Sequence, residues 1–303
     1  MARRPGRRLT ALLTLLVLAA CSPVAGRAWP TSDPGTSSMP TTTTTGAEIT
    51  TSTLDPTTTS APPFTTTSSG SVEVDADVAV PSGDGPFPTA VLVHGGGWVT
   101  GSPDVLRPLA DYLVEQGYLT VNTRYDLADF DNAAFPEAVD DVACAVRYAA
   151  THPASDGTVA VIGHSAGAHI GALVALTGDR YGADCPHPGS GVPKRFVGLA
   201  GPYDVSRLGI AIVAFFGAGP EHAPEVWDAG NPQLLTDENT ALDSLILYGD
   251  EDGLVDASFA IDFFEALSLS GSQSLLELVE GAGHNEVHDP DLVGDLIVTW
   301  LER

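Results

Sequence analysis

Strand-like and helix-like runs alternate through residues 72–303. Short apolar runs predict strands at 72–80, 88–94, 118–123, 158–163, 195–200, 243–248 and 274–279. Apolar residues at helical spacing predict helices at 103–116, 135–151, 165–177, 256–269 and 289–301. This alternation is typical of an α/β fold with a mostly parallel central sheet and helices on both faces. In such a fold, ligands bind beyond the carboxyl ends of the strands.

Two segments depart from the regular alternation. Residues 72–80 alternate between polar and apolar side chains, which predicts a strand at the edge of the sheet. Residues 205–241 contain Gly, Pro and an apolar run at 208–216, so we expect a small cap insertion there.

The predicted strand at 158–163 runs directly into Gly163-His164-Ser165-Ala166-Gly167, and a buried helix follows. A G-x-S-x-G motif between a strand and a helix predicts a nucleophile elbow, in which a tight turn exposes the serine hydroxyl. The helix dipole favours negative charge at this position. The motif alone is weak, because both residue types are common, so the assignment of Ser165 depends on the other groups.

A second glycine-rich turn, His94-Gly95-Gly96-Gly97-Trp98, ends an earlier predicted strand. Glycines let backbone N–H groups approach a reacting carbonyl, so Gly96, Gly97 and Ala166 are the candidate oxyanion hole. The alternative is an ordinary Gly-rich connection between a strand and a helix.

A serine nucleophile needs a base, and the base needs an orienting acid. Asp252 follows the strand at 243–248 and His284 follows the strand at 274–279, which predicts the triad Ser165, Asp252 and His284. Asp250 is a rival acid and His288 is a rival base.

Several other side chains have two interpretations. Trp98 and Tyr203 are candidates to line the substrate pocket, although Trp98 suits a packing role equally well. His169, one helical turn after Ser165, is expected to be a packed residue near the site. Cys185 and His187 are too sparse for a metal site, and neither a metal nor an organic cofactor is expected.

The first 71 residues are not expected to belong to the fold. Residues 1–8 carry four Arg and residues 9–20 are apolar, which predicts a signal peptide at 1–20. Leu18-Ala19-Ala20-Cys21 predicts acylation of Cys21, and therefore a lipid anchor on the outer face of a bacterial membrane. An ordinary cleavage site beside a cysteine is the alternative. Residues 21–71 are rich in Thr, Ser and Pro, which predicts a disordered tether.

Charge and cysteine content restrict the environment. The 39 acidic and 13 basic residues give a formal net charge of -26, which excludes nucleic acid as a partner. An oxidising compartment predicts a disulfide between Cys144 and Cys185, with two free thiols as the alternative. The sequence predicts no particular oligomeric state.

Four motifs together resemble the α/β-hydrolase esterases: His94–Trp98, Gly163–Gly167, the run at 135–142 and Gly201-Pro202-Tyr203-Asp204. The nearest branches are the hormone-sensitive-lipase-like carboxylesterases, the bacterial acetylxylan and feruloyl esterases, and the arylformamidases. The resemblance covers residues 72–303 and implies an α/β-hydrolase catalytic domain. It also implies the same nucleophile, acid, base and oxyanion glycines, although Tyr248 replaces the usual His before Asp252.

The expected function is hydrolysis of carboxylic esters of small to medium size through an acyl-enzyme. Trp98 and His169 also occur in the arylformamidase pattern, so formamide hydrolysis is an alternative. A non-catalytic binding module would lack part of the triad, and a peptidase would carry a larger cap.

Overall fold

The computed structural model describes residues 74–129 and 131–303. The predicted signal peptide at 1–20, the acylated Cys21 and the tether at 21–71 therefore lie outside the described residues. In those two ranges, no helix is both long enough and apolar enough to cross a membrane.

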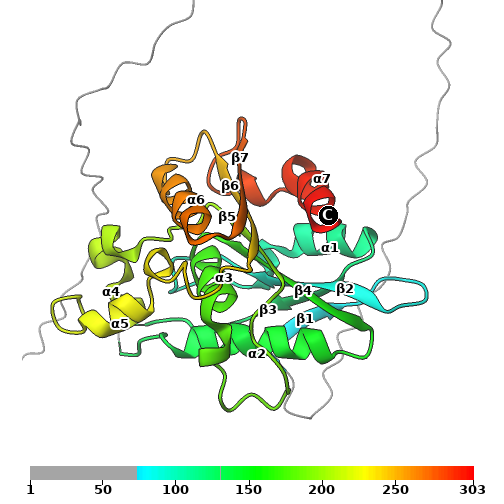
Figure 1. Cartoon of the computed structure of the whole chain (residues 1–303), viewed down its shortest axis with the longest axis horizontal. Helices are drawn as coiled ribbons and strands as arrows, with labels where there is room; N and C mark the ends of the chain where they lie inside the picture. Colours follow the sequence, from blue (N-terminus) through cyan, green and yellow to red (C-terminus); the bar gives the residue numbers. More distant parts are fainter. Residues whose placement is uncertain (1–73, 130) are drawn as a thin grey trace, which may run out of the picture. The chain divides into compact units, whose positions relative to one another are not determined.

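The described strands form one sheet in the order β1-β3-β2-β4-β5-β6-β7 (Figure 1). They are β1 (Ala76–Ala79), β2 (Phe87–Val93), β3 (Leu119–Thr123), β4 (Ser155–His164), β5 (Arg195–Leu199), β6 (Asp243–Gly249) and β7 (Gln273–Val279). Each neighbouring pair is parallel except β1 and β3, which run antiparallel. The mostly parallel sheet is confirmed, and β1 lies at its edge as the alternating sequence predicted.

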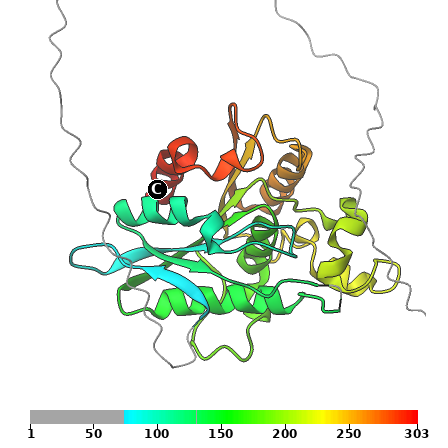
Figure 2. The same ribbon diagram turned by 180° about the vertical axis from the view of Figure 1, so that it is seen from behind.

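Helices cover both faces of the sheet (Figures 1 and 2). The long ones are α1 (Arg107–Glu115), α2 (Glu137–Thr151), α3 (Ala166–Thr177), α6 (Ser258–Ser270) and α7 (Pro290–Leu301). The helix predicted at 103–116 is divided, because a 3-10 turn at Pro103–Val105 precedes α1. Pro108 lacks an N–H group, so it fits the first turn of a new helix but not the interior of a longer one.

The two faces of β4 belong to two separate cores. Val159 and Val161 belong to the core that also contains side chains of α2, α3 and α6, whereas Ala160 and Ile162 belong to the core that contains side chains of α1 and α7. None of these four side chains is more than 5% exposed. A strand buried on both faces needs apolar side chains at successive positions, which explains the continuous apolar run.

The insertion at 205–241 consists of short helices and turns, including α4 (Val213–Phe216) and α5 (Pro224–Ala229). Its aromatic side chains belong to the same hydrophobic core as those of α2 and α3. The rings of Phe216 and Trp227 lie 4.8 Å apart, and both side chains are buried. Arg207 fastens the start of the insertion to α6 through an ion pair of 2.9 Å with Asp262.

Candidate active site

Ser165 stands between β4 and α3 in a strained turn. Its backbone has φ +54° and ψ −120°, and its N–H donates to the carbonyl oxygen of Leu199 at 2.8 Å. A Cβ atom on Gly163 would lie 2.3 Å from the carbonyl oxygen of Gly167, and one on Gly167 would lie 2.1 Å from that of Val93. The turn can therefore be this tight only with glycine at both positions.

The loops after β6 and β7 bring an acid and a base to this turn. Nε2 of His284 lies 2.9 Å from Oγ of Ser165, and Nδ1 of His284 lies 2.8 Å from Oδ2 of Asp252. The other oxygen of Asp252 accepts the N–H groups of Leu254 and Val255 at 2.8 and 2.9 Å. Because a carboxylate only accepts, Nδ1 of His284 carries the proton and Nε2 is free to accept one from Ser165.

The rival acid and base have other contacts. Oδ1 of Asp250 accepts the N–H of Gly281 at 2.7 Å, so its carboxylate joins the two loops. The ring of His288 lies 4.6 Å from that of His164, and burial lowers the pKa of His288. The geometry therefore favours Asp252 and His284, the pair that the sequence placed at the strand ends.

The glycine-rich turn after β2 abuts the serine. A Cβ atom on Gly95 would lie 3.1 Å from Cβ of Ser165. Gly96 has φ +134°, and its carbonyl oxygen accepts the N–H groups of Val99 and Thr100 at 3.4 and 3.2 Å. Gly97 has φ +60° and is exposed. The candidate oxyanion residues thus lie on a turn beside Ser165 and, for Ala166, at the first position of α3.

Two contacts near the site were missed by sequence reasoning. Nε2 of His164 donates its proton to the backbone carbonyl of His284 at 2.8 Å. The hydroxyl of Tyr125 donates to the carbonyl of His94 at 2.9 Å, directly before the glycine turn. Each contact joins a side chain to distant backbone, and such pairs leave no local pattern in the sequence. The only available signal was a polar residue, His164, at the end of a buried strand.

The two candidate pocket residues are both buried. Trp98 is 5% exposed, and its indole N–H donates to Nδ1 of His169 at 3.2 Å. This contact favours the packing interpretation of Trp98. Tyr203 is 0% exposed, and its ring stacks on that of Phe263 in α6 at 4.2 Å. The pocket role expected for Tyr203 is therefore corrected, because its ring belongs to the core between the sheet and α6.

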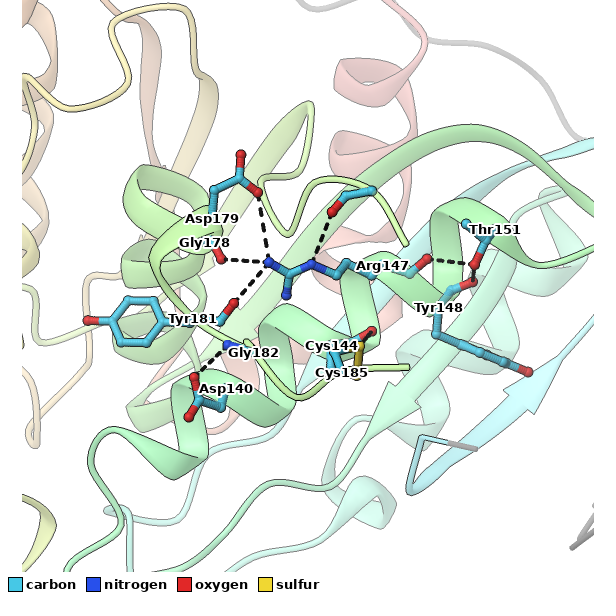
Figure 3. The surroundings of a disulfide bond; sticks show 11 residues. Asp140, Cys144, Arg147, Tyr148, Thr151, Gly178, Asp179, Tyr181, Gly182 and Cys185 are labelled. Carbon is cyan, nitrogen blue, oxygen red and sulfur yellow. Dashed lines mark hydrogen bonds and ion pairs between the residues drawn. A yellow bond between two sulfur atoms is a disulfide. The ribbon is translucent and has the colours of Figure 1, made fainter. Parts of the chain in front are cut away.

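Cys144 and Cys185 form a disulfide, as the cysteine count suggested. Figure 3 shows the bond between α2 and the loop that follows α3. Arg147, one turn along α2 from Cys144, donates to the carbonyl oxygens of Tyr181 and Gly189 at 2.9 and 3.1 Å. The loop is thus held to α2 by a covalent bond and by a buried guanidinium.

No group of three or more His, Cys, Asp or Glu side chains suited to a metal ion occurs within 74–129 and 131–303.

A mostly parallel sheet with a serine elbow after one strand, and an acid and a histidine after later strands, defines the α/β-hydrolase fold. A model of the family designated BD-FAE matches residues 76–267. The chain belongs to this family.

Solved structures share the fold. A bifunctional acetyl ester-xyloside hydrolase from Caldicellulosiruptor lactoaceticus superposes with a TM-score of 0.64 at 18% identity, over 75% of this chain and 87% of the other. Esterase 2 of Thermogutta terrifontis with bound propionate gives a TM-score of 0.60 at 21% identity, over 75% of this chain and 89% of the other.

Curated relatives are similar in sequence. Esterase LipC of Mycobacterium tuberculosis is 30% identical over 221 residues, which are 66% of this chain and 53% of the relative. Kynurenine formamidase avaC of Aspergillus versicolor is 27% identical over 132 residues, 39% of this chain and 44% of the relative. The chain spans about half the length of these two relatives.

Proposed function

We propose that the protein hydrolyses carboxylic esters through an acyl-enzyme on Ser165. The observation that carries the proposal is the continuous hydrogen-bonded chain from Asp252 through His284 to Ser165, with separations of 2.8 and 2.9 Å. Membership of the BD-FAE family and similarity to esterase LipC support the same reaction.

In the acylation step, Oγ of Ser165 attacks the ester carbonyl carbon while Nε2 of His284 accepts the hydroxyl proton. Asp252 keeps the imidazole in the required tautomer and stabilises its cation. The carbonyl oxygen gains the electron pair of the broken π bond, and the amide N–H groups of Gly96, Gly97 and Ala166 stabilise this oxyanion. The intermediate then collapses, and the alcohol leaves with the proton from Nε2.

In the deacylation step, His284 accepts a proton from water as the oxygen of that water attacks the acyl carbon. A second tetrahedral intermediate forms against the same amide groups. Its collapse breaks the bond to Oγ, and His284 returns the proton to Ser165. The acid is released and the free enzyme is restored, so this cycle consumes only ester and water.

The proposed substrates are esters of small to medium size, with acylated carbohydrates among them. A structural neighbour described as an acetyl ester-xyloside hydrolase supports the carbohydrate class. Formamide hydrolysis is the second candidate, favoured by the similarity to a kynurenine formamidase and by Trp98 and His169. A non-catalytic binding role is the third.

The proposed location is the outer face of a bacterial membrane, with Cys21 as the acylated residue and 21–71 as a tether. The disulfide supports an oxidising compartment. Cys21→Ser should move the protein from the membrane fraction to the soluble fraction. Retention of this variant in the membrane fraction would refute the lipid anchor.

The function is tested with the full-length protein on p-nitrophenyl esters of graded chain length, acetylated xylan and an aryl formamide. We expect ester turnover that falls by about 10⁶-fold in Ser165→Ala, while the thermal midpoint stays unchanged. Turnover of the formamide alone would select the second candidate, and no turnover of any substrate would select the binding role. Equal ester turnover by Ser165→Ala would refute the serine mechanism.

A further inference from the structure

Trp98 has an unusual backbone for a residue with a large side chain. Three consecutive residues, Gly96, Gly97 and Trp98, have φ values of +134°, +60° and +64°. Glycine adopts such angles freely, whereas a tryptophan in this region is strained and persists only where its surroundings fix it. The contacts of the indole ring therefore decide whether the candidate oxyanion turn keeps its shape.

The indole has one polar contact, which sets the state of a buried histidine. The indole N–H of Trp98 donates to Nδ1 of His169 at 3.2 Å, so Nδ1 must be an acceptor. Nε2 therefore carries the proton and donates it to the carbonyl oxygen of Gly230 at 2.8 Å. His169 is 0% exposed, and burial lowers its pKa to about 4, so the ring is neutral at pH 7. Trp98 thus donates to His169, and His169 donates to Gly230, so the three residues form one chain of hydrogen bonds.

This chain joins three parts of the molecule. Trp98 belongs to the turn after β2, and Gly230 directly follows α5 in the insertion. His169 lies on α3, where its backbone N–H donates to the carbonyl of Ser165 at 3.1 Å. Phe215 of α4 also packs on both rings, with its centroid 5.9 Å from Trp98 and 5.6 Å from His169. The insertion is thus connected to the turn through a histidine on the nucleophile's own helix.

We propose that His169 is a positioning residue that holds the Gly96–Trp98 turn in its catalytic shape and couples that shape to the 205–241 insertion. The inference rests on the proposed function, because the turn matters only if it binds an oxyanion. His169 touches no reacting atom in this role. It acts by keeping Trp98 in place, and through Trp98 the amide groups of the two preceding glycines.

Three substitutions in the full-length protein separate this role from simple packing. Trp98→Phe keeps an aromatic ring but removes the N–H donor, and His169→Leu removes both hydrogen bonds. His169→Gln is the conservative variant, because an amide presents an acceptor and a donor at nearly the spacing of the two ring nitrogens. Gly230→Ala tests the coupling, since its methyl group would lie 2.3 Å from the ring of Phe216 and displace the residue.

Active sites are counted by the initial burst of p-nitrophenol, so that a misfolded fraction does not affect the comparison. Per active site, Trp98→Phe, His169→Leu and Gly230→Ala should lower kcat by about 10-fold to 100-fold, with KM within threefold of the unaltered protein. A trifluoromethyl ketone, whose hemiketal oxygen mimics the oxyanion, should lose affinity in the same proportion. His169→Gln should recover most of kcat.

The outcomes distinguish the inference from the proposed function. Wild-type kcat per active site in Trp98→Phe and His169→Leu would overturn the inference, even if both thermal midpoints fall. A loss of kcat without a matching loss of inhibitor affinity would also overturn it. Wild-type kcat in Gly230→Ala would overturn the coupling to the insertion. No ester turnover by the unaltered protein would refute the proposed function itself, and the inference with it.

Discussion

His164 donates a hydrogen bond from Nε2 to the backbone carbonyl of His284, 2.8 Å away. The donor directly precedes Ser165, the proposed nucleophile, and the acceptor belongs to the proposed base. His164 is 3% exposed, and burial lowers its pKa to about 3, so it remains a neutral donor at pH 7. The contact fixes the loop of His284 against the strand that presents Ser165.

Removing this donor should therefore loosen the base without removing it. His164→Leu removes the donor to the partly buried carbonyl of His284, which costs about 1 kcal/mol, and we expect kcat to fall by about 10-fold. His164→Gln can donate from its amide nitrogen and should retain more than half of kcat. Both variants are compared by ester turnover per titrated active site and by thermal unfolding. Equal kcat in His164→Leu and the unaltered protein would show that the contact has no catalytic effect.

Asp252 and Asp250 provide a direct test of the assigned acid. Asp252→Asn removes the charge that fixes the tautomer of His284, and kcat should fall by about 10³-fold to 10⁴-fold. Asp250→Asn affects only the bond to Gly281 that joins the two loops, and kcat should fall by less than about threefold. Ester hydrolysis at pH 8 measures both. The reverse order of losses would make Asp250 the acid.

The sequence predicted those parts of the site that follow strand ends. The positions of Ser165, Asp252 and His284 are set by local features, namely a buried run and the turn directly after it. The roles of His164 and His169 depend on partners far away in the chain. The partner of His164 is 120 residues later, and those of His169 are Trp98 and Gly230. Pairs of this kind arise only when the sheet assembles, so no local spacing predicts them.

The same distinction explains the error at Tyr203. Tyr203 follows the carboxyl end of β5, and the candidate site lies beyond the carboxyl ends of the strands. Its position in the chain therefore suggested a pocket residue. A tyrosine carries a large apolar ring, and burial of that ring against Phe263 is favourable. The direction of a side chain at a strand end depends on what packs beneath it, in this case α6. The strand pattern contains no information on that contact.

Gly96 and Gly281 offer a matched pair of positive-φ glycines. Both have φ values that favour glycine, +134° and +72°, but their surroundings differ. A Cβ atom on Gly96 would lie 1.9 Å from the carbonyl oxygen of Thr100, whereas one on Gly281 would have no atom within 4 Å. Gly281→Ala should cost only about 1–2 kcal/mol of unfolding free energy. Gly96→Ala must displace the proposed oxyanion turn, and kcat should fall by about 10²-fold or more. Similar kcat values in the two variants would contradict the role of the turn.

The disulfide should affect the thermal stability of the fold but not the rate of the reaction. Cys144 and Cys185 are 41 residues apart. A closed loop of this length lowers the conformational entropy of the unfolded chain and raises the free energy of unfolding by about 3–4 kcal/mol. The variant with serine at both positions should unfold at a lower temperature, while kcat below that temperature stays unchanged. Arg147 still holds the loop in this variant (Figure 3). A fall in kcat without a fall in stability would indicate that the loop takes part in the reaction.

Asp141 should make stability depend on pH in the direction opposite to an ordinary paired carboxylate. Burial raises the pKa of Asp141 to about 6, although the N–H of Asp126 stabilises its charged form at 2.9 Å. Between about pH 4 and pH 6 the folded protein therefore binds more protons at this group than the unfolded chain does. The stabilising contribution of protonated Asp141 to the free energy of unfolding is fully present below pH 4 and is lost as the pH rises through 6.

Asp141→Asn cannot ionise and still presents an oxygen to the N–H of Asp126. The variant should therefore gain thermal stability relative to the unaltered protein at pH 8, and the gain should shrink toward pH 4. Asp184→Asn, at an exposed position, removes the same charge and serves as the control. Thermal unfolding of the three proteins from pH 4 to pH 8 isolates the effect of Asp141 as a difference between curves. A difference that does not vary with pH would mean that Asp141 has the same pKa in the folded and the unfolded chain.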